Sequence, residues 1–116
     1  MTGSQKFNIL SGFDALLTRA HEHTLAAGFC VEPDVRNEAE LIALTHGELS
    51  EALEYIRHGN PPSDHIPEFS GVEEELADAV IRIADHAAAR GYRLGEAIVA
   101  KMKFNSTRPH KHGKKF

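Results

Sequence analysis

Two helix-forming segments joined by a proline-containing loop constrain the fold of this chain most. The first segment is expected over 37–58, with Asn37 as its N-cap, and the second over 71–90, with Ser70 as its N-cap. A glycine follows each segment and ends the helical pattern. Three prolines exclude helix from the stretch 60–70. The pattern therefore predicts two helices that pack antiparallel across an ordered loop.

Each of these segments carries a pair of acids spaced i,i+3. The pairs are Glu48 with Glu51 and Glu75 with Asp78. Residues three apart lie on one face of a helix, so each pair can direct two carboxylates at one point. Four carboxylates from two helices make a site for Mg²⁺, with Mn²⁺ as a substitute. By helical projection Asp78 lies further round than Glu75, so convergence of all four depends on how the helices pack.

The first acidic pair also lies within a row of apolar residues. Leu41, Leu44, Glu48, Glu51 and Tyr55 follow the 3,4 spacing of a buried helix seam. A buried carboxylate without a partner is costly, so an acid in such a position must be solvated, neutralised or bound to a metal. A solvated helix face is the ordinary explanation of one such pair. Two pairs on consecutive helices favour the metal site.

The pattern of apolar residues predicts helices in the rest of the chain as well. Further helices are expected over about 8–27 and 94–106, and no segment has the alternating pattern of a strand. The predicted fold class is all-α: a single domain of residues 1–116 forming a four-helix bundle, with a basic tail from about residue 107 to residue 116. Alanine-rich helices with wide apolar faces favour a homodimer, or a tetramer, as the state that completes their burial.

Composition and charge narrow the class of protein. The formal net charge is −4, and no acid follows Glu96 although several lysines and arginines do. An acidic middle beside a basic end suits an anionic ligand held with cations. The net acidity and the lack of basic residues interleaved with aromatic ones argue against nucleic-acid binding. No apolar run suggests a membrane span, and the lone Cys30 fits a reducing compartment, so we expect a cytoplasmic protein.

Two histidines on the first helix, His21 and His23, are spaced i,i+2. Residues at that spacing point to different sides of a helix and do not form a metal pair. We therefore interpret both as surface histidines, with contact to a nucleobase from this helix as the alternative.

These motifs resemble those of the MazG-like, all-α nucleoside triphosphate pyrophosphohydrolases. The similarity covers roughly residues 38 to 116. It rests on Glu-Leu-Ser-Glu-Ala-Leu-Glu at 48–54, Arg57-His-Gly-Asn60, Glu-Glu-Leu-Ala-Asp-Ala-Val at 74–80, Lys101-Met-Lys-Phe-Asn105, Arg108-Pro109 and Lys111-His-Gly-Lys-Lys-Phe116. The two-part acidic motif is moderately specific, and the Lys-x-x-x-Asn ending strengthens it.

The resemblance implies hydrolysis of an NTP or dNTP between the α and β phosphates, which releases a nucleoside monophosphate and pyrophosphate. It implies that Glu48, Glu51, Glu75 and Asp78 bind Mg²⁺ and act as the catalytic residues, with one of them positioning or deprotonating the attacking water. Which of the four does so stays open.

The resemblance also implies substrate contacts from the last helix. Lys101 and Asn105 match positions that contact phosphate or nucleotide, and their i,i+4 spacing places them on one face. Arg108 is a further candidate for phosphate contact because of its charge and its position. A solvated helix end, with cations near its C-terminal dipole, explains Arg108 equally well.

Two other functions remain open from the sequence. Phosphoribosyl-ATP pyrophosphohydrolase uses a related acidic architecture and cleaves the same bond, although the loop and tail here resemble it less. The other alternative is a non-catalytic helical module, such as a dimeric adaptor that retains nucleotide binding. Nothing in the sequence encodes base or sugar specificity.

Overall fold

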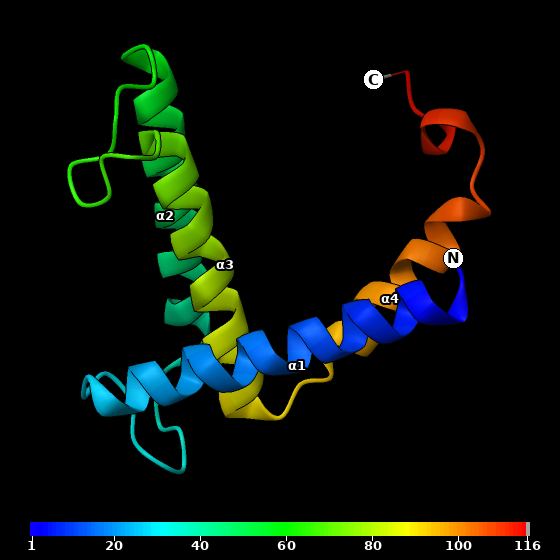
Figure 1. Cartoon of the computed structure of the whole chain (residues 1–116), viewed down its shortest axis with the longest axis horizontal. Helices are drawn as coiled ribbons and strands as arrows, with labels where there is room; N and C mark the ends of the chain where they lie inside the picture. Colours follow the sequence, from blue (N-terminus) through cyan, green and yellow to red (C-terminus); the bar gives the residue numbers. More distant parts are fainter. Residues whose placement is uncertain (116) are drawn as a thin grey trace.

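The computed structural model describes residues 1–115, and every regular element in that range is helical (Figure 1). Helix α1 spans Gly3–Ala26, α2 Glu38–Arg57, α3 Gly71–Arg90 and α4 Leu94–Ser106, and a short 3-10 helix covers His110–Gly113. The described chain is therefore all-α, as the sequence predicts. The end of the predicted basic tail, Phe116, lies outside the described residues.

Helix α1 begins earlier than the expected start near residue 8. Thr2 is its N-cap, and the Thr2 hydroxyl accepts a hydrogen bond of 3.0 Å from the backbone N–H of Gln5. The Gln5 side-chain oxygen in turn accepts a hydrogen bond of 2.8 Å from the backbone N–H of Thr2. This capping box satisfies two N–H groups that a helix start otherwise leaves without partners, and so it extends the helix toward the N-terminus.

The other helix boundaries agree with the sequence-based prediction. Asn37 caps α2, accepting a hydrogen bond of 3.1 Å from the backbone N–H of Glu40. Ser70 caps α3 in a capping box with Glu73. Helix α3 ends where Gly91 adopts a left-handed conformation with φ of 69°, which glycine reaches without steric cost. Local signals therefore determine where α2 and α3 begin and where α3 ends.

The loop between α2 and α3 is ordered, as predicted, and it is fastened to the start of α3. Ser63 is buried and donates a hydrogen bond of 2.8 Å from its hydroxyl to Glu74 Oε1. The same hydroxyl oxygen accepts hydrogen bonds from the backbone N–H groups of His65 and Ile66. At the start of α3, Gly71 lies directly against the Tyr55 ring, leaving no room for a Cβ atom. The loop thereby fixes the spacing of the two helices beside the acidic pairs.

The helices form two arms rather than one closed bundle within a single copy of the chain (Figure 1). Helices α2 and α3 lie antiparallel as a hairpin, α1 crosses the C-terminal part of α3, and α4 packs along α1 away from the hairpin. The radius of gyration is 16.5 Å, whereas a compact domain of this length has about 13 Å. The predicted four-helix bundle is therefore not completed by one chain.

The core of one copy is thin. Its buried apolar residues are small: Ala20, Cys30, Ala52, Ala79, Ala84 and Ala87. Each hairpin helix instead leaves an apolar stripe exposed, with side chains 42% to 59% accessible. We call these the apolar stripes: Leu49, Leu53 and Ile56 on α2, and Leu76, Val80 and Ile83 on α3. Both have the i, i+4, i+7 spacing of a face that packs against another helix.

Within residues 1–115, none of the helices combines the length and the hydropathy that crossing a lipid bilayer requires.

Candidate metal centre and adjoining pockets

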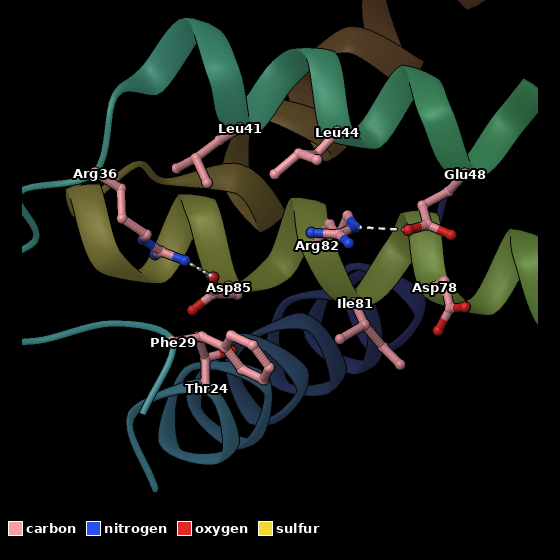
Figure 2. A pocket seen from close by; sticks show the side chains of 10 residues that line it. All are labelled: Thr24, Phe29, Arg36, Leu41, Leu44, Glu48, Asp78, Ile81, Arg82 and Asp85. Carbon is pink, nitrogen blue, oxygen red and sulfur yellow. Dashed lines mark hydrogen bonds and ion pairs between the residues drawn. The ribbon is translucent and has the colours of Figure 1, made fainter. Parts of the chain in front are cut away.

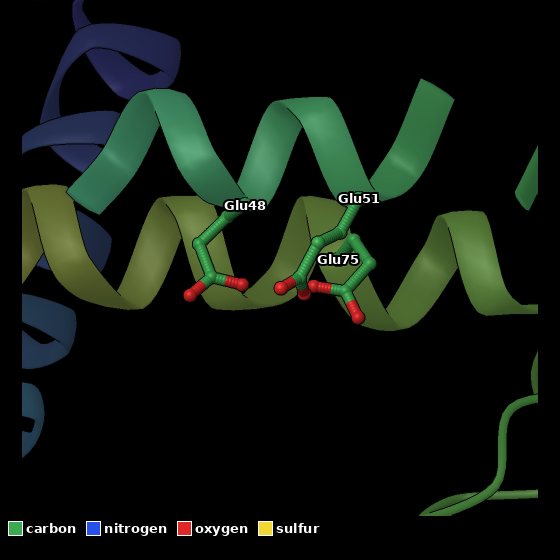
Figure 3. A group of neighbouring side chains, drawn as sticks. All are labelled: Glu48, Glu51 and Glu75. Carbon is green, nitrogen blue, oxygen red and sulfur yellow. The ribbon is translucent and has the colours of Figure 1, made fainter. Parts of the chain in front are cut away.

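Three of the four predicted acids meet between α2 and α3. Glu48 and Glu51 extend from α2 and Glu75 from α3, and their carboxylates point toward one another (Figure 3). One oxygen from each lies within 4.8 Å of the others. The antiparallel hairpin produces this convergence, because it sets the middle of α2 beside the first turns of α3. We call these three residues the acid cluster.

Glu75 is the most constrained member of the acid cluster. Glu75 is only 6% exposed. Its Oε2 atom is buried and has no hydrogen-bond donor. The Glu48 and Glu51 carboxylates lie within 4.8 Å of the Glu75 carboxylate, and two carboxylates form a hydrogen bond only when they share a proton. Burial, and then the proximity of these two acids, raises the pKa of Glu75 to about 8. Glu75 therefore holds its proton more tightly than an ordinary carboxyl group does.

Asp78 lies at the margin of the acid cluster. One of its oxygens is within 4.8 Å of Glu74 and Glu75, and its side chain lines the same pocket as that of Glu48 (Figure 2). Burial raises the pKa of Asp78, and the nearby charges of Glu48 and Glu74 raise it further, while Arg82 lowers it. The four predicted acids therefore share one region, with Glu75 joining Asp78 to the other two.

Glu74 also lies near Glu75 and Asp78, but its carboxylate is engaged by the loop between α2 and α3. Its Oε1 atom accepts one hydrogen bond from the Ser63 hydroxyl, and its Oε2 atom lies 3.0 Å from His65 Nδ1. The His65 contact, followed by that of Ser63, lowers the pKa of Glu74. Because both of its oxygens are engaged by the loop, Glu74 serves to anchor that loop.

A pocket of about 350 Å³ opens beside Glu48 and Asp78 (Figure 2). Leu41 and Leu44 from α2 form one wall, and Ile81 from α3 lies opposite them. The far end is polar, with Arg36 and Asp85 in contact with each other. We call this the leucine pocket. Acidic at one end and apolar along its walls, it can accept a molecule that carries both a charged and a flat apolar part.

A second pocket, of about 470 Å³, lies on the loop side of the acid cluster. Glu51 and Glu75 line it together with Tyr55, His58 and His65. The acid cluster therefore stands between two openings. A ligand bound at the carboxylates can extend to either side.

The polar end of the leucine pocket is a network of buried charges. Arg36 donates hydrogen bonds of 2.8 Å to Asp34 Oδ1 and to Asp85 Oδ2. The hydrogen bond from Arg36 holds the pKa of Asp34 well below its usual range. This network joins the segment between α1 and α2 to the C-terminal half of α3. We call Asp34, Arg36 and Asp85, with His21, the charge network.

His21 belongs to the charge network, so the prediction that it is a surface residue was wrong. Its Nδ1 atom lies 2.8 Å from Asp85 Oδ1 and its Nε2 atom 2.6 Å from Glu32 Oε1. The hydrogen bond with Asp85 raises the pKa of His21, against the opposing effect of burial, and Glu32 raises it further. The sequence carried a signal, because His21 lies between Ala20 and Thr24 on the inward face of α1.

The three predicted substrate-contact residues lie on the other arm. Lys101 and Arg108 flank the Phe104 ring, with Lys101 Nζ 4.6 Å and Arg108 Cζ 5.7 Å from its centre. Asn105 Oδ1 is buried without a hydrogen-bond donor. Among the residues described, none from α4 lines either pocket beside the acid cluster. One copy of the chain therefore does not bring these residues to the acids.

No family model, curated protein or solved structure matches the chain. What the site can do therefore rests on its geometry. The donor set fits a divalent cation of the Mg²⁺ type, because its ligands are all carboxylate oxygens and Glu75 Oε2 is buried without a partner. The sequence indicated these acids by their spacing, but it did not indicate Arg82, whose Nε atom donates a hydrogen bond of 2.8 Å to Glu48 Oε1.

Proposed function

We propose that this chain is a nucleoside triphosphate pyrophosphohydrolase of the MazG-like kind that depends on a divalent cation. The observation that carries the proposal is the acid cluster, in which one oxygen from each of three carboxylates on two helices lies within 4.8 Å of the others and Glu75 Oε2 is buried without a donor. A bound cation supplies the positive charge that this oxygen lacks. The same cation can hold phosphate oxygens, which are the ligands that Mg²⁺ most often shares with carboxylates.

In this proposal Glu48, Glu51, Glu75 and Asp78 hold Mg²⁺, or Mn²⁺ in its place. The cation would neutralise phosphate charge and lower the pKa of the attacking water. Water adds to the α-phosphorus and the bond to the α,β-bridging oxygen breaks, so a nucleoside monophosphate and pyrophosphate form. One carboxylate of the four accepts the proton that the water gives up. The arrangement does not single out which of them is the base.

The leucine pocket is our candidate for the nucleoside part of the substrate. It begins at Glu48 and Asp78 and is walled by aliphatic side chains of α2 and α3. A nucleobase has two apolar faces and polar edges, which suits aliphatic walls with a polar far end. The charge network would then meet the edge of the base.

We further propose that the working form is a homodimer, or a tetramer built from dimers. The apolar stripes of α2 and α3 would form its interface, because one copy leaves them exposed on an open arrangement of helices. A second copy can also bring its own Lys101, Asn105 and Arg108 to the acid cluster. That arrangement would complete the four-helix bundle and explain why one chain alone separates these residues from the acids.

The assembly is tested by measuring mass in solution. Light scattering after size-exclusion chromatography is expected to give at least twice the mass of one chain. Replacing Leu53 with Glu places a charge in the middle of an apolar stripe, so it should reduce the mass to that of a monomer. Val35→Glu, at an exposed apolar residue between α1 and α2, is the matched control and should leave the mass unchanged. A wild-type monomer would refute the proposed assembly.

The activity is tested by incubating the protein with Mg²⁺ and a panel of NTPs and dNTPs. Pyrophosphate release is expected with wild type, and Glu51→Gln should lower it by about 100-fold while the protein stays folded, because an amide is a poor ligand and a poor base. Glu22→Gln removes an equivalent charge from the exposed face of α1 and should retain activity.

Three outcomes would contradict the proposal. Release of orthophosphate in place of pyrophosphate would exclude cleavage between the α and β phosphates. Turnover of phosphoribosyl-ATP alone would select the related pyrophosphohydrolase of histidine biosynthesis. No release from wild type with any substrate would leave the non-catalytic helical module as the better account.

A further inference from the structure

The chain places one cation of its own against the acid cluster. Arg82 Nε donates a hydrogen bond of 2.8 Å to Glu48 Oε1. Arg82 lies on the same face of α3 as Glu75 and Asp78, one turn beyond Asp78. The contact therefore joins a carboxylate of α2 to the acidic face of α3, at the mouth of the leucine pocket.

Arg82 occupies the middle of that pocket. Figure 2 shows its guanidinium between Glu48 and Asp78 at one end and the Arg36–Asp85 pair at the other. Its side chain is 41% exposed, so the guanidinium has access to a ligand in the pocket. A group in this position can reach what binds beside the carboxylates without a change in the backbone.

Arg82 also has donors to spare, unlike the other arginine of the pocket. The Nε, Nη1 and Nη2 atoms of Arg36 all donate to Asp34 or Asp85. The hydrogen bond to Glu48 is the one that the Arg82 side chain makes within residues 1–115. A guanidinium carries five N–H donors in a planar fork that matches two oxygens of a phosphate group. Of the two arginines, Arg82 is thus the one able to bind an anion.

We propose that Arg82 contacts the phosphate chain of the substrate, and that Glu48 holds the guanidinium beside the site until that carboxylate binds a divalent cation. The inference rests on the proposed function, because it assumes a cation at the acid cluster. A divalent cation on Glu48 draws electron density from the carboxylate and so weakens its hydrogen bond to Arg82. Loss of its partner turns the exposed guanidinium toward the strongest remaining acceptor, and a triphosphate supplies phosphate oxygens there.

Two affinities distinguish this role from one in which Arg82 only orders Glu48: the affinity of the protein for the cation and its affinity for phosphate. If Arg82 competes with the cation for Glu48, removing Arg82 leaves cation binding equally tight or tighter. If Arg82 contacts phosphate, the same change weakens phosphate binding. A guanidinium that only orders Glu48 would instead weaken cation binding when removed and would leave the phosphate affinity of the cation-loaded protein unchanged.

Calorimetry with two probes separates these cases. Mn²⁺ alone is titrated first, and inorganic tripolyphosphate is then titrated into protein saturated with Mn²⁺, so no choice of base is needed. The variants are Arg82→Ala, Arg82→Lys and the control Arg19→Ala, an exposed arginine on α1. Arg82→Ala should bind Mn²⁺ at least as tightly as wild type and tripolyphosphate about 30-fold more weakly. Arg82→Lys keeps the positive charge but loses the planar guanidinium, so its affinity for tripolyphosphate should lie between those of wild type and Arg82→Ala.

Two results would overturn the inference. Either Arg82→Ala binds tripolyphosphate as tightly as Arg19→Ala does, or Arg82→Ala loses affinity for Mn²⁺. Thermal melting of each variant confirms that it is folded before titration. If wild type binds no Mn²⁺ and releases no pyrophosphate, the proposed function itself fails. If wild type does both and Arg82→Ala behaves like the control, only the role of Arg82 is lost.

Discussion

Replacing Glu75 with Gln is expected to lower pyrophosphate release by about 1,000-fold and, at the same time, to stabilise the cation-free protein. Activity falls because the amide removes the carboxylate that joins Asp78 to the other acids. Above pH 4.5 stability rises because the folded wild-type protein must either keep on Glu75 a proton that the unfolded chain has released or ionise Glu75 beside Glu48 and Glu51, and Gln avoids both costs. Few substitutions of a buried residue have these opposite effects.

The stability effect of Glu75 depends on pH. The pKa of this acid is raised from 4.5 to about 8 in the folded protein. Below pH 4.5 the group is neutral in both the folded and the unfolded state, so it has no effect. As the pH rises from 4.5 through 8, the unfolded chain ionises first, and the wild-type protein loses stability relative to Glu75→Gln. Each pKa unit corresponds to about 1.4 kcal/mol, so a rise from 4.5 to about 8 gives the variant a stability advantage of at most about 4 kcal/mol at pH 8.

Urea denaturation in the presence of a chelator, at pH 5 and pH 8, measures this difference. Addition of Mg²⁺ should stabilise wild type and leave Glu75→Gln almost unchanged, because the cation binds the ionised cluster. Glu22→Gln serves again as the control for removal of one charge. A variant that retains activity within tenfold of wild type, or that is less stable than wild type at pH 8, would refute the assignment of Glu75 to a metal centre.

Replacing Asp85 with Ala is expected to destabilise the protein by about 3–5 kcal/mol, which is a large share of the stability of a small domain. The Asp85 side chain is 8% exposed and lies 2.8 Å from both His21 and Arg36. Without the Asp85 carboxylate, Arg36 keeps only Asp34 as an acidic partner, and His21 keeps only Glu32. Because these contacts fasten α1 and the segment after it to α3, the far end of the leucine pocket should lose its structure as well.

Chemical denaturation measures the loss of stability, and nuclear magnetic resonance titration provides a second readout. The pKa of His21 should fall in the variant, since the hydrogen bond with Asp85 is the main cause of its rise. Asp14→Ala, at an exposed position on α1, is the control and should change stability by less than about 0.5 kcal/mol. A loss below about 1 kcal/mol for Asp85→Ala, with the His21 pKa unchanged, would contradict the charge network as a structural element.

Helix boundaries were the part of the fold most accessible from sequence. Asn37, Ser70 and Gly91 act through hydrogen bonds and backbone conformations within a few residues of themselves, so their effect can be read without knowing the fold. The start of α1 differs from the prediction because Thr2 and Gln5 form a cap that lies before the apolar pattern of that helix begins.

The candidate site likewise has features that depend on local sequence and features that depend on how the helices pack. The spacing of Glu48 with Glu51 fixes that both lie on one face of α2, whatever surrounds them. Glu75 meets these two acids only because α2 and α3 form a hairpin. Arg82 contacts Glu48, which is 34 residues away in the sequence, and His21 contacts Asp85, which is 64 residues away. No local pattern records contacts of that range.

The sequence by itself determined that the chain is helical, where α2, α3 and α4 begin and end, and that two acidic pairs lie on helix faces. Only the tertiary structure decided that Glu75 is buried among other carboxylates, that Arg82 lies against Glu48, and that α4 packs on α1 away from the acids. The reason is physical. Caps and periodicity act over a few residues of backbone, whereas burial and charge pairing depend on side chains that meet only when separate helices pack.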